Sequence, residues 1–138
     1  MILVDTTPLV ALCDRRDALH GRATRDLERL SRERFVASDA VLAEAMHLMP
    51  TVSGRARVLL LVESLPMLAW PTEHADATRA DAIRWTRRYA EHQPDWADAL
   101  LAVASGREKR ARVWTYDSEF TTTWRRLDGT KIPLATRG

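Results

Sequence analysis

The feature that most constrains the fold of this chain is an alternation of short apolar runs with longer helical stretches. The runs predicted to be strands cover residues 1–4, 35–37, 67–70 and 113–116. Continuous apolarity over so few residues is typical of strands that are covered on both faces. A helix between successive strands requires a crossover connection, so the pattern predicts an α/β fold with a mostly parallel sheet flanked by helices.

Capping residues and apolar spacing place the helices between these strands. Thr6 or Thr7 can cap the first helix, with Pro8 at its first position. Ser38 and Asp95 can cap two later helices, because their side-chain oxygens accept from backbone N–H groups of a first turn. The expected helices cover residues 8–13, 18–30, 39–49, 55–63, 72–91 and 96–104.

The ends of the predicted elements are marked by turn residues. Residues 50–54 break one helix, and Ser105-Gly106 ends or loosens another. The segment after Phe120 is polar, and Asp128-Gly129 predicts a turn within it. Residues 132–134 are expected to form an edge strand, because Pro133 has no N–H to donate to a neighbouring strand.

Length and composition set broad limits. We expect the 138 residues to form a single domain, 1–138, and 46% hydrophobic residues is ordinary for a globular chain. The sequence shows no apolar run of membrane-spanning length and no signal-peptide pattern. Cys13 has no intrachain partner, which favours a buried thiol and fits a cytoplasmic location. Only Lys109 and Lys131 among the 21 basic residues are lysines. Arginine suits phosphate binding, although codon usage alone can produce this bias.

Acidic residues follow two of the predicted strands directly. Asp5 and Asp117 should therefore lie at the carboxyl edge of the sheet, where ligands bind in such folds. Asp98 is at the start of the helix that leads into the last of these strands, and its place at the edge follows less directly. Asp95 lies three residues before Asp98 and shares its helix face. A structural interpretation is also open, in which Asp95 is a helix cap and Asp117 is a solvated loop residue.

Carboxylates that converge at one edge repel one another, unless a cation neutralises them or some stay protonated. Oxygen ligands select hard cations such as Mg²⁺ or Mn²⁺, whose usual task at such sites is phosphoester hydrolysis by an activated water. The four histidines are scattered, without zinc-site spacing, and are interpreted as surface or packing residues. Glu44 lies among apolar helix residues, which favours a partly buried carboxylate over a solvated one.

Four segments, taken in order, resemble the motifs of PIN-domain ribonucleases, and most closely the toxins of VapBC toxin–antitoxin systems. They are ILVDTTPLVAL at 2–12, VLAE at 41–44, DWADA at 95–99 and TYDSEF at 115–120. Each is a weak signal alone, and the four in sequence are a strong one. Thr7 departs from the Ser or Gly usual in relatives, and the segment after Phe120 has no clear match.

The resemblance implies an α/β/α sandwich, Mg²⁺-dependent cleavage of RNA, with Mn²⁺ as a substitute, and neutralisation by a cognate antitoxin. The catalytic quartet it implies is Asp5, Glu44, Asp98 and Asp117. Three of these, Asp5, Asp98 and Asp117, would be the metal ligands. The supporting residues it implies are Thr6, Asp95, Thr115 and Glu119. Apolar helices such as 8–13 and 39–49 are candidates for a homodimer face.

Tryptophans and paired arginines are further candidates for contact with RNA. The five tryptophans are interpreted as core or interface residues, with Trp96, next to the site, as the exception. Two arginine pairs, Arg87-Arg88 and Arg125-Arg126, would grip the RNA backbone if they flank the site, and are otherwise solvated charges.

Two other interpretations remain at this stage. A phosphatase of the haloacid dehalogenase type also has an Asp after its first strand, but it needs a second Asp two residues on, where this chain has Thr7. A non-catalytic PIN-fold module that binds RNA or protein would keep the fold without the reaction. The intact quartet argues against that module, because unneutralised carboxylates without a metal would be a liability.

Overall fold

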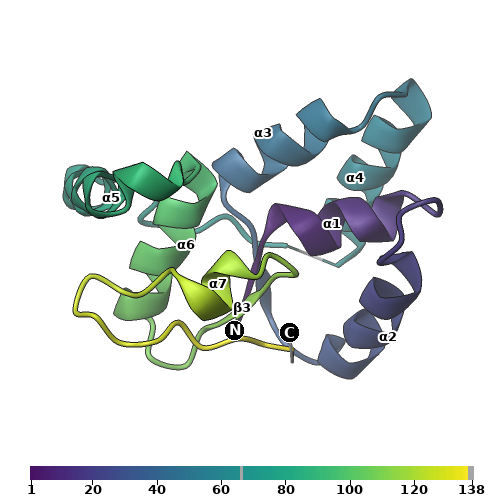
Figure 1. The fold of residues 1–138 in the computed structure, drawn as a ribbon. Coiled ribbons are helices and arrows are strands. Elements are labelled where there is room, and N and C mark those ends of the chain that lie inside the picture. The colour runs from purple at the N-terminus through teal and green to yellow at the C-terminus, as the bar shows by residue number, and fades with distance from the viewer. Residues whose placement is uncertain (66, 137–138) are drawn as a thin grey trace.

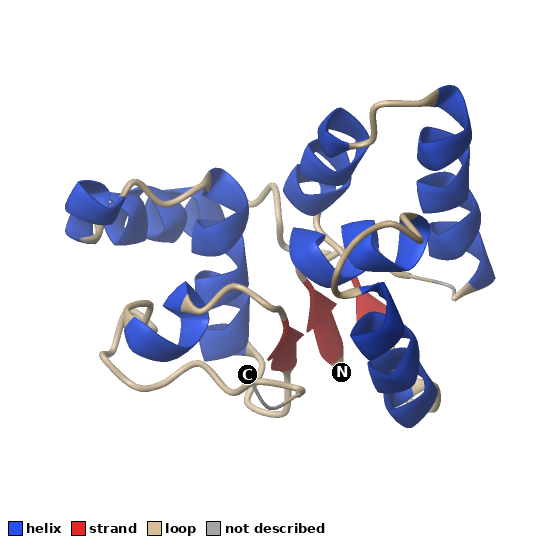
Figure 2. Cartoon of the chain, turned by 45° about the vertical axis from the view of Figure 1, so that its right-hand side comes forward, coloured by secondary structure: helices blue, strands red, loops and turns tan. Residues whose placement is uncertain are grey.

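Three parallel strands form the centre of the structure, which is a computed structural model describing residues 1–65 and 67–136. The strands are β1 (Ile2–Val4), β2 (Phe35–Val36) and β3 (Arg112–Trp114), in the order β2-β1-β3. Ile2 is in register with Phe35 on one side and with Arg112 on the other. Figure 2 shows these strands at the centre of the molecule, between helices. The predicted parallel sheet is confirmed.

The helices of the described residues come in chain order between and after these strands. They are α1 (Thr6–Cys13), α2 (His20–Leu30), α3 (Asp39–Leu48), α4 (Val52–Ser64), α5 (Asp76–Arg88), the 3-10 turn η1 (Ala90–His92), α6 (Trp96–Arg107) and α7 (Glu119–Thr122). No helix in the described ranges is both long and apolar enough to cross a membrane.

The sheet separates two hydrophobic cores, because successive side chains of a strand point to opposite faces. Ile2 and Val4 of β1 pack with α1, α2, α3 and α4. Leu3 packs instead with α5 and α6. Figure 1 shows the same division, with α1 to α4 on one side of the strands and α5 and α6 on the other. This arrangement is the expected α/β/α sandwich.

The two outer predicted strands are present in position but not in length. Leu68 pairs with Val36 and Leu134 pairs with Val113, each through one isolated parallel bridge. At the second of these edges the Pro133 carbonyl accepts from the Val113 N–H, but proline has no N–H to extend the ladder. The apolar pattern therefore predicted both segments in the right place, but it predicted strands where the structure has one bridge each.

Local capping explains where the helices differ from the predictions. The Thr51 hydroxyl accepts from the Gly54 N–H at 3.0 Å, so α4 begins inside the predicted break at 50–54. In α6, the Ser105 hydroxyl donates to the Ala102 carbonyl, and the helix continues through Gly106 to Arg107. The predicted helix 72–91 is shorter, as α5 followed by η1, and α7 was not predicted.

The C-terminal hairpin, residues 125–131, is held against α5. Gly129 has a φ of 84°, a backbone conformation that favours glycine, at the predicted turn. Arg125 and Lys131 form an isolated antiparallel β-bridge through their backbones. The Trp85 indole N–H donates to the Arg125 carbonyl at 2.7 Å, and Arg88 donates to the Leu127 carbonyl. The expectation for the tryptophans is confirmed: four are buried, and Trp96 is 42% exposed.

Candidate active site

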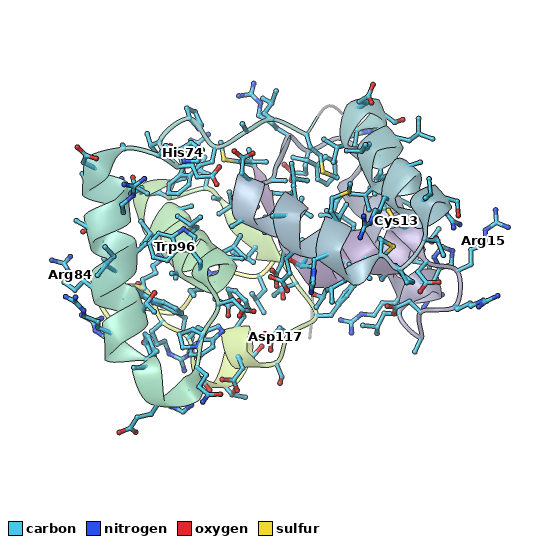
Figure 3. The ribbon with its side chains drawn as sticks, turned by 90° about the horizontal axis from the view of Figure 1, so that it is seen from above. Cys13, Arg15, His74, Arg84, Trp96 and Asp117 are labelled. Atoms are coloured by element: carbon cyan, nitrogen blue, oxygen red, sulfur yellow. The ribbon has the colours of Figure 1, made fainter. Side chains whose placement is uncertain are left out.

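The acidic residues are brought together from four separate elements at the carboxyl edge of the sheet. Asp5 follows β1 and caps α1, Asp117 follows β3, Glu44 lies within α3, and Asp98 is in the first turn of α6. Figure 3 looks down on this edge, with Asp117 labelled near its middle and Trp96 to one side. Electrostatic repulsion links Asp5 to Glu44 and Asp117, and links Asp98 to Asp5, Asp95 and Asp117.

Asp5 is a buried carboxylate that is fixed at both oxygens. Its Oδ1 accepts from the Thr6 N–H at 2.7 Å, and its Oδ2 accepts from the Thr115 hydroxyl at 2.7 Å. Only 5% of Asp5 is exposed. The pKa of Asp5 is raised to about 6, chiefly by burial; the hydrogen bonds from Thr115 and Thr6 oppose this rise, and the Glu44 and Asp117 carboxylates add to it.

Thr115 joins the ends of the two neighbouring strands. Its hydroxyl donates to Asp5 and accepts from the Asp117 N–H at 3.0 Å. The Asp117 carboxylate in turn accepts from the Glu119 N–H at 3.0 Å. The hydroxyl therefore fixes the distance between two of the predicted metal ligands, in keeping with the supporting role expected for Thr115.

Asp98 is held by the capping interaction at the start of α6. Its Oδ2 accepts from the Asp95 N–H at 3.0 Å, and Asp98 is 8% exposed. Burial is the largest cause that raises the pKa of Asp98 to about 7, and the Asp5, Asp95 and Asp117 carboxylates add to it. The structural and functional interpretations of this pair are therefore compatible, because one carboxylate oxygen caps the helix while the group stays within the acidic cluster.

Glu44 is half-buried and faces the same cluster. Burial raises its pKa above the usual value, and Asp95 and Asp117 raise it further. The Thr6 hydroxyl lies close enough to Glu44 to lower this pKa, yet it is buried and makes no hydrogen bond of good geometry with the described residues. A buried hydroxyl without a partner costs free energy, so this atom suits a water or a ligand oxygen between Thr6 and Glu44.

These observations fit a hard divalent cation at the predicted ligands. Asp5, Asp98 and Asp117 provide carboxylate oxygens with remaining lone pairs, next to the unpartnered Thr6 hydroxyl. The raised pKa values of Asp5 and Asp98 show that ionisation is costly, and a cation would remove that cost. No three quartet members place ligand atoms within 4.8 Å of one another, so in this arrangement at least one of the three predicted ligands would reach the ion through a bound water, which Mg²⁺ readily keeps.

A tighter group of ligand atoms lies elsewhere, at the start of α3. Asp39, Glu73 and His74 each place one within 4.8 Å of the others. Both Glu73 oxygens already accept from the Asp39 N–H, at 2.9 and 3.1 Å, and His74 pairs with Asp39 at 3.2 Å. We interpret this group as a cap for α3. Sequence spacing gave no sign of it, because Asp39 precedes the other two by more than 30 residues.

Sequence reasoning missed a second layer of contacts behind the site. The Thr7 hydroxyl accepts from the Tyr116 N–H at 2.9 Å, so the residue that departs from the family pattern ties α1 to the segment after β3. The Tyr116 hydroxyl donates to the buried Asp26 at 2.7 Å. Asp26 lies on the buried face of α2 with Ala23 and Leu30, and an acid at such a position does not by itself predict a partner 90 residues away. Glu119, the remaining predicted supporting residue, accepts from the hydroxyl of Thr123, which directly follows α7, and its role stays a prediction.

Comparison with known proteins supports this picture of the fold. The family model of the PIN domain matches residues 2–124. The crystal structure of VapC20 from Mycobacterium tuberculosis, described as a toxin that cleaves the sarcin–ricin loop, superposes with a TM-score of 0.72. The match has 22% sequence identity and covers 88% of this chain and 94% of VapC20. The comparison with curated protein sequences gives no match.

Proposed function

This chain belongs to the PIN domain family, and from that premise we propose that it is a Mg²⁺-dependent endoribonuclease that acts as a VapC-like toxin. The observation that carries the proposal is the convergence of Asp5, Glu44, Asp98 and Asp117 from four elements, with Asp5 and Asp98 buried. Burying acids beside other acids is costly. A site that binds a cation accounts for their arrangement.

Asp5, Asp98 and Asp117 would hold the cation, which is Mg²⁺ or its substitute Mn²⁺. Such an ion supplies an activated water and neutralises the charge that develops on the phosphate. The chain's own contribution is rigidity, because Thr115 and Thr6 fix Asp5 through two hydrogen bonds of 2.7 Å, and the helix cap fixes Asp98.

Glu44 and Thr6 would position the attacking water. Glu44 can accept a proton from that water, and its raised pKa makes it a better base than a solvated Glu. The Thr6 hydroxyl, which lacks a partner among the described residues, can hold the water in line with the phosphorus. Asp95 extends the negative potential next to Glu44, which helps to draw the cation in.

The toxin role extends the proposal from the site to the cell. It is supported by the similarity in fold to VapC20, a toxin by its description. The proposed partners are an RNA substrate, a cognate antitoxin protein and a second copy of the chain in a homodimer, and the proposed location is the cytoplasm.

The experiment is induced expression in bacteria. The wild-type chain should arrest growth, and Asp5→Asn should relieve the arrest, since Asn keeps the shape of the side chain but removes the charge that would hold the ion. Asp128→Asn is the matched control, because Asp128 is an exposed residue of the C-terminal turn, and it should arrest growth like wild type. Arrest by Asp5→Asn at wild-type strength would favour a non-catalytic binding module, and absence of arrest by wild type would remove the toxin role.

A further inference from the structure

A basic cleft lies between α2 and the C-terminal residues Ala135 and Thr136. Its volume is about 470 Å³, and it is lined by Arg22, Arg25, Asp26 and Arg29 of α2 and by Ala135 and Thr136. The three arginines are spaced three and four residues apart, so they lie along one helix face. From Arg22 to Arg29 this row is about 10 Å long, at 1.5 Å per residue.

The buried Asp26 organises two of these arginines. Its Oδ1 pairs with Arg29 at 3.2 Å, and its Oδ2 lies 3.8 Å from Arg22 and accepts from the Tyr116 hydroxyl. Asp26 is 3% exposed, so its oxygens are used within the protein and do not face the solvent. One carboxylate against three guanidinium groups leaves an excess of two positive charges along the cleft.

Arg25 is the arginine of this row whose charge has no ion-pair partner among the described residues. It lies between Arg22 and Arg29, is exposed, and has no ion pair or hydrogen bond among the described residues. Arg29 is 74% exposed at its side chain despite its pairing. Guanidinium groups in this position can still donate to phosphate oxygens, because each has five N–H donors.

Arg22 connects the cleft to the segment that carries Asp117. The guanidinium carbon of Arg22 lies 4.6 Å from the centre of the Tyr116 ring, and Tyr116 directly precedes Asp117. A strand of RNA with one phosphate at the acidic site would therefore have its neighbouring phosphates within reach of α2. Those phosphates need cations, since the site itself is surrounded by carboxylates that repel them.

Three of the four arginines in the pairs suggested by the sequence are less available for this task. Arg88 donates to the Leu127 carbonyl, and Arg125 donates to the Thr121 and Trp124 carbonyls. Arg126 donates to the Ser105 hydroxyl at 3.4 Å. These three side chains hold the C-terminal hairpin against α5, α6 and α7.

We infer that the α2 cleft is a subsite for the RNA backbone, in which Arg25 and Arg29 bind phosphates next to the one that is cleaved. The inference rests on the proposed ribonuclease function and adds where the strand lies. Asp26 is a positioning residue in this arrangement, because it holds Arg29 and Arg22 beside Arg25.

The experiment measures binding of a fluorescent single-stranded RNA to an Asp98→Asn background as salt is varied. Arg25→Gln with Arg29→Gln should weaken binding roughly 10- to 30-fold at 0.1 M salt and lower the salt slope by about 1.4, as expected for two lost contacts with a single strand. The matched control is Lys109→Gln with Arg110→Gln. Lys109 and Arg110 are exposed and precede β3, at the amino ends of the strands. Their substitution removes the same two positive charges as the double variant in α2. This control should bind within about twofold of the parent.

Arg25→Gln alone guards against misfolding, because Arg25 makes no contact that the fold needs. It should lower the slope by about 0.7. In the cleaving enzyme the double variant should raise KM with little change in kcat, as for a lost uniform binding contact. Unchanged binding by the double variant, or an equal loss in the control, would overturn the inference. Binding that depends on α2 in a protein that cleaves no RNA would refute the proposed function and leave the subsite standing.

Discussion

The acidic site and the α2 cleft solve opposite problems with like charges. In the cleft, three arginines share a helix face, and Asp26 is placed among them as a counter-charge. At the acidic site, the described residues place Asp5, Glu44, Asp98 and Asp117 together, and hydroxyl and amide hydrogen bonds are their only protein partners. The cleft therefore contains a counter-charge from the protein that offsets part of its positive charge, whereas no basic side chain pairs with the described carboxylates of the acidic site. This difference favours a cation as the counter-charge at the acidic site.

The largest effect should come from removing one charge at the acidic site. Asp98→Asn should lower the rate of RNA cleavage by at least about 10³-fold, since it weakens both the hold on the ion and its geometry. The same variant should melt in EDTA at a temperature equal to or above wild type, because the amide still accepts from the Asp95 N–H and repulsion is reduced. Quantified cleavage products and thermal melts give both values. A large fall in Tm would instead make Asp98 a structural cap.

The same kind of change in the cleft should have the opposite effect on stability. Asp26→Asn leaves the Arg22 and Arg29 guanidinium groups without their buried counter-charge. With partly exposed arginines the loss should be about 2 kcal/mol, less than for a fully buried pair. For a chain of this size that is a fall in Tm of roughly 8 °C. Asp128→Asn serves as the control, and its Tm should stay close to wild type. A Tm of Asp26→Asn equal to wild type would show that the two regions do not differ in this way.

A smaller effect is expected from pH in the absence of metal. The pKa values of Asp5 and Asp98 are raised from the usual value of 3.8 to about 6 and about 7. The folded state therefore binds protons at Asp5 and Asp98 more tightly than the unfolded state does. The stabilisation that this proton binding gives is complete below pH 3.8 and is lost as pH rises to 7. In EDTA, Tm should fall by several degrees between pH 5 and pH 7.5, and Mg²⁺ should restore it. Asp98→Asn should flatten the profile, and a profile that rises with pH would contradict the sign.

The sequence could predict those features that depend on local pattern. Apolar runs placed β1, β2 and β3, and the positions of Asp5 and Asp117 directly after strands put both at the carboxyl edge. Glu44 and Asp98 needed the family motifs, because residues within helices can face in any direction until the packing is known. For Asp95 the sequence predicted two roles, a helix cap and a supporting residue of the site, because its position three residues before Asp98 favours both.

Long-range contacts could not be predicted from one sequence. The hydrogen bond from Thr115 to Asp5 joins residues 110 positions apart, and that from Tyr116 to Asp26 joins residues 90 apart. Nothing local marks Asp26 as buried, because an acid between arginines on a helix is usually a solvated partner. Arg88 and Arg125 were similarly ambiguous, and only the position of the hairpin shows that they bind carbonyls.

Cleavage of purified RNA is the decisive assay for a metal-dependent ribonuclease site at the converging carboxylates. Wild-type protein should cut a mixed RNA pool with Mg²⁺ or Mn²⁺ and stop when EDTA is added. Asp5→Asn should not cut under any of these conditions, although it should bind RNA as tightly as wild type or more tightly, because a repulsive charge is gone. Cleavage by wild type that continues undiminished in EDTA, or cleavage by Asp5→Asn at the wild-type rate, would rule out metal-dependent hydrolysis at these carboxylates.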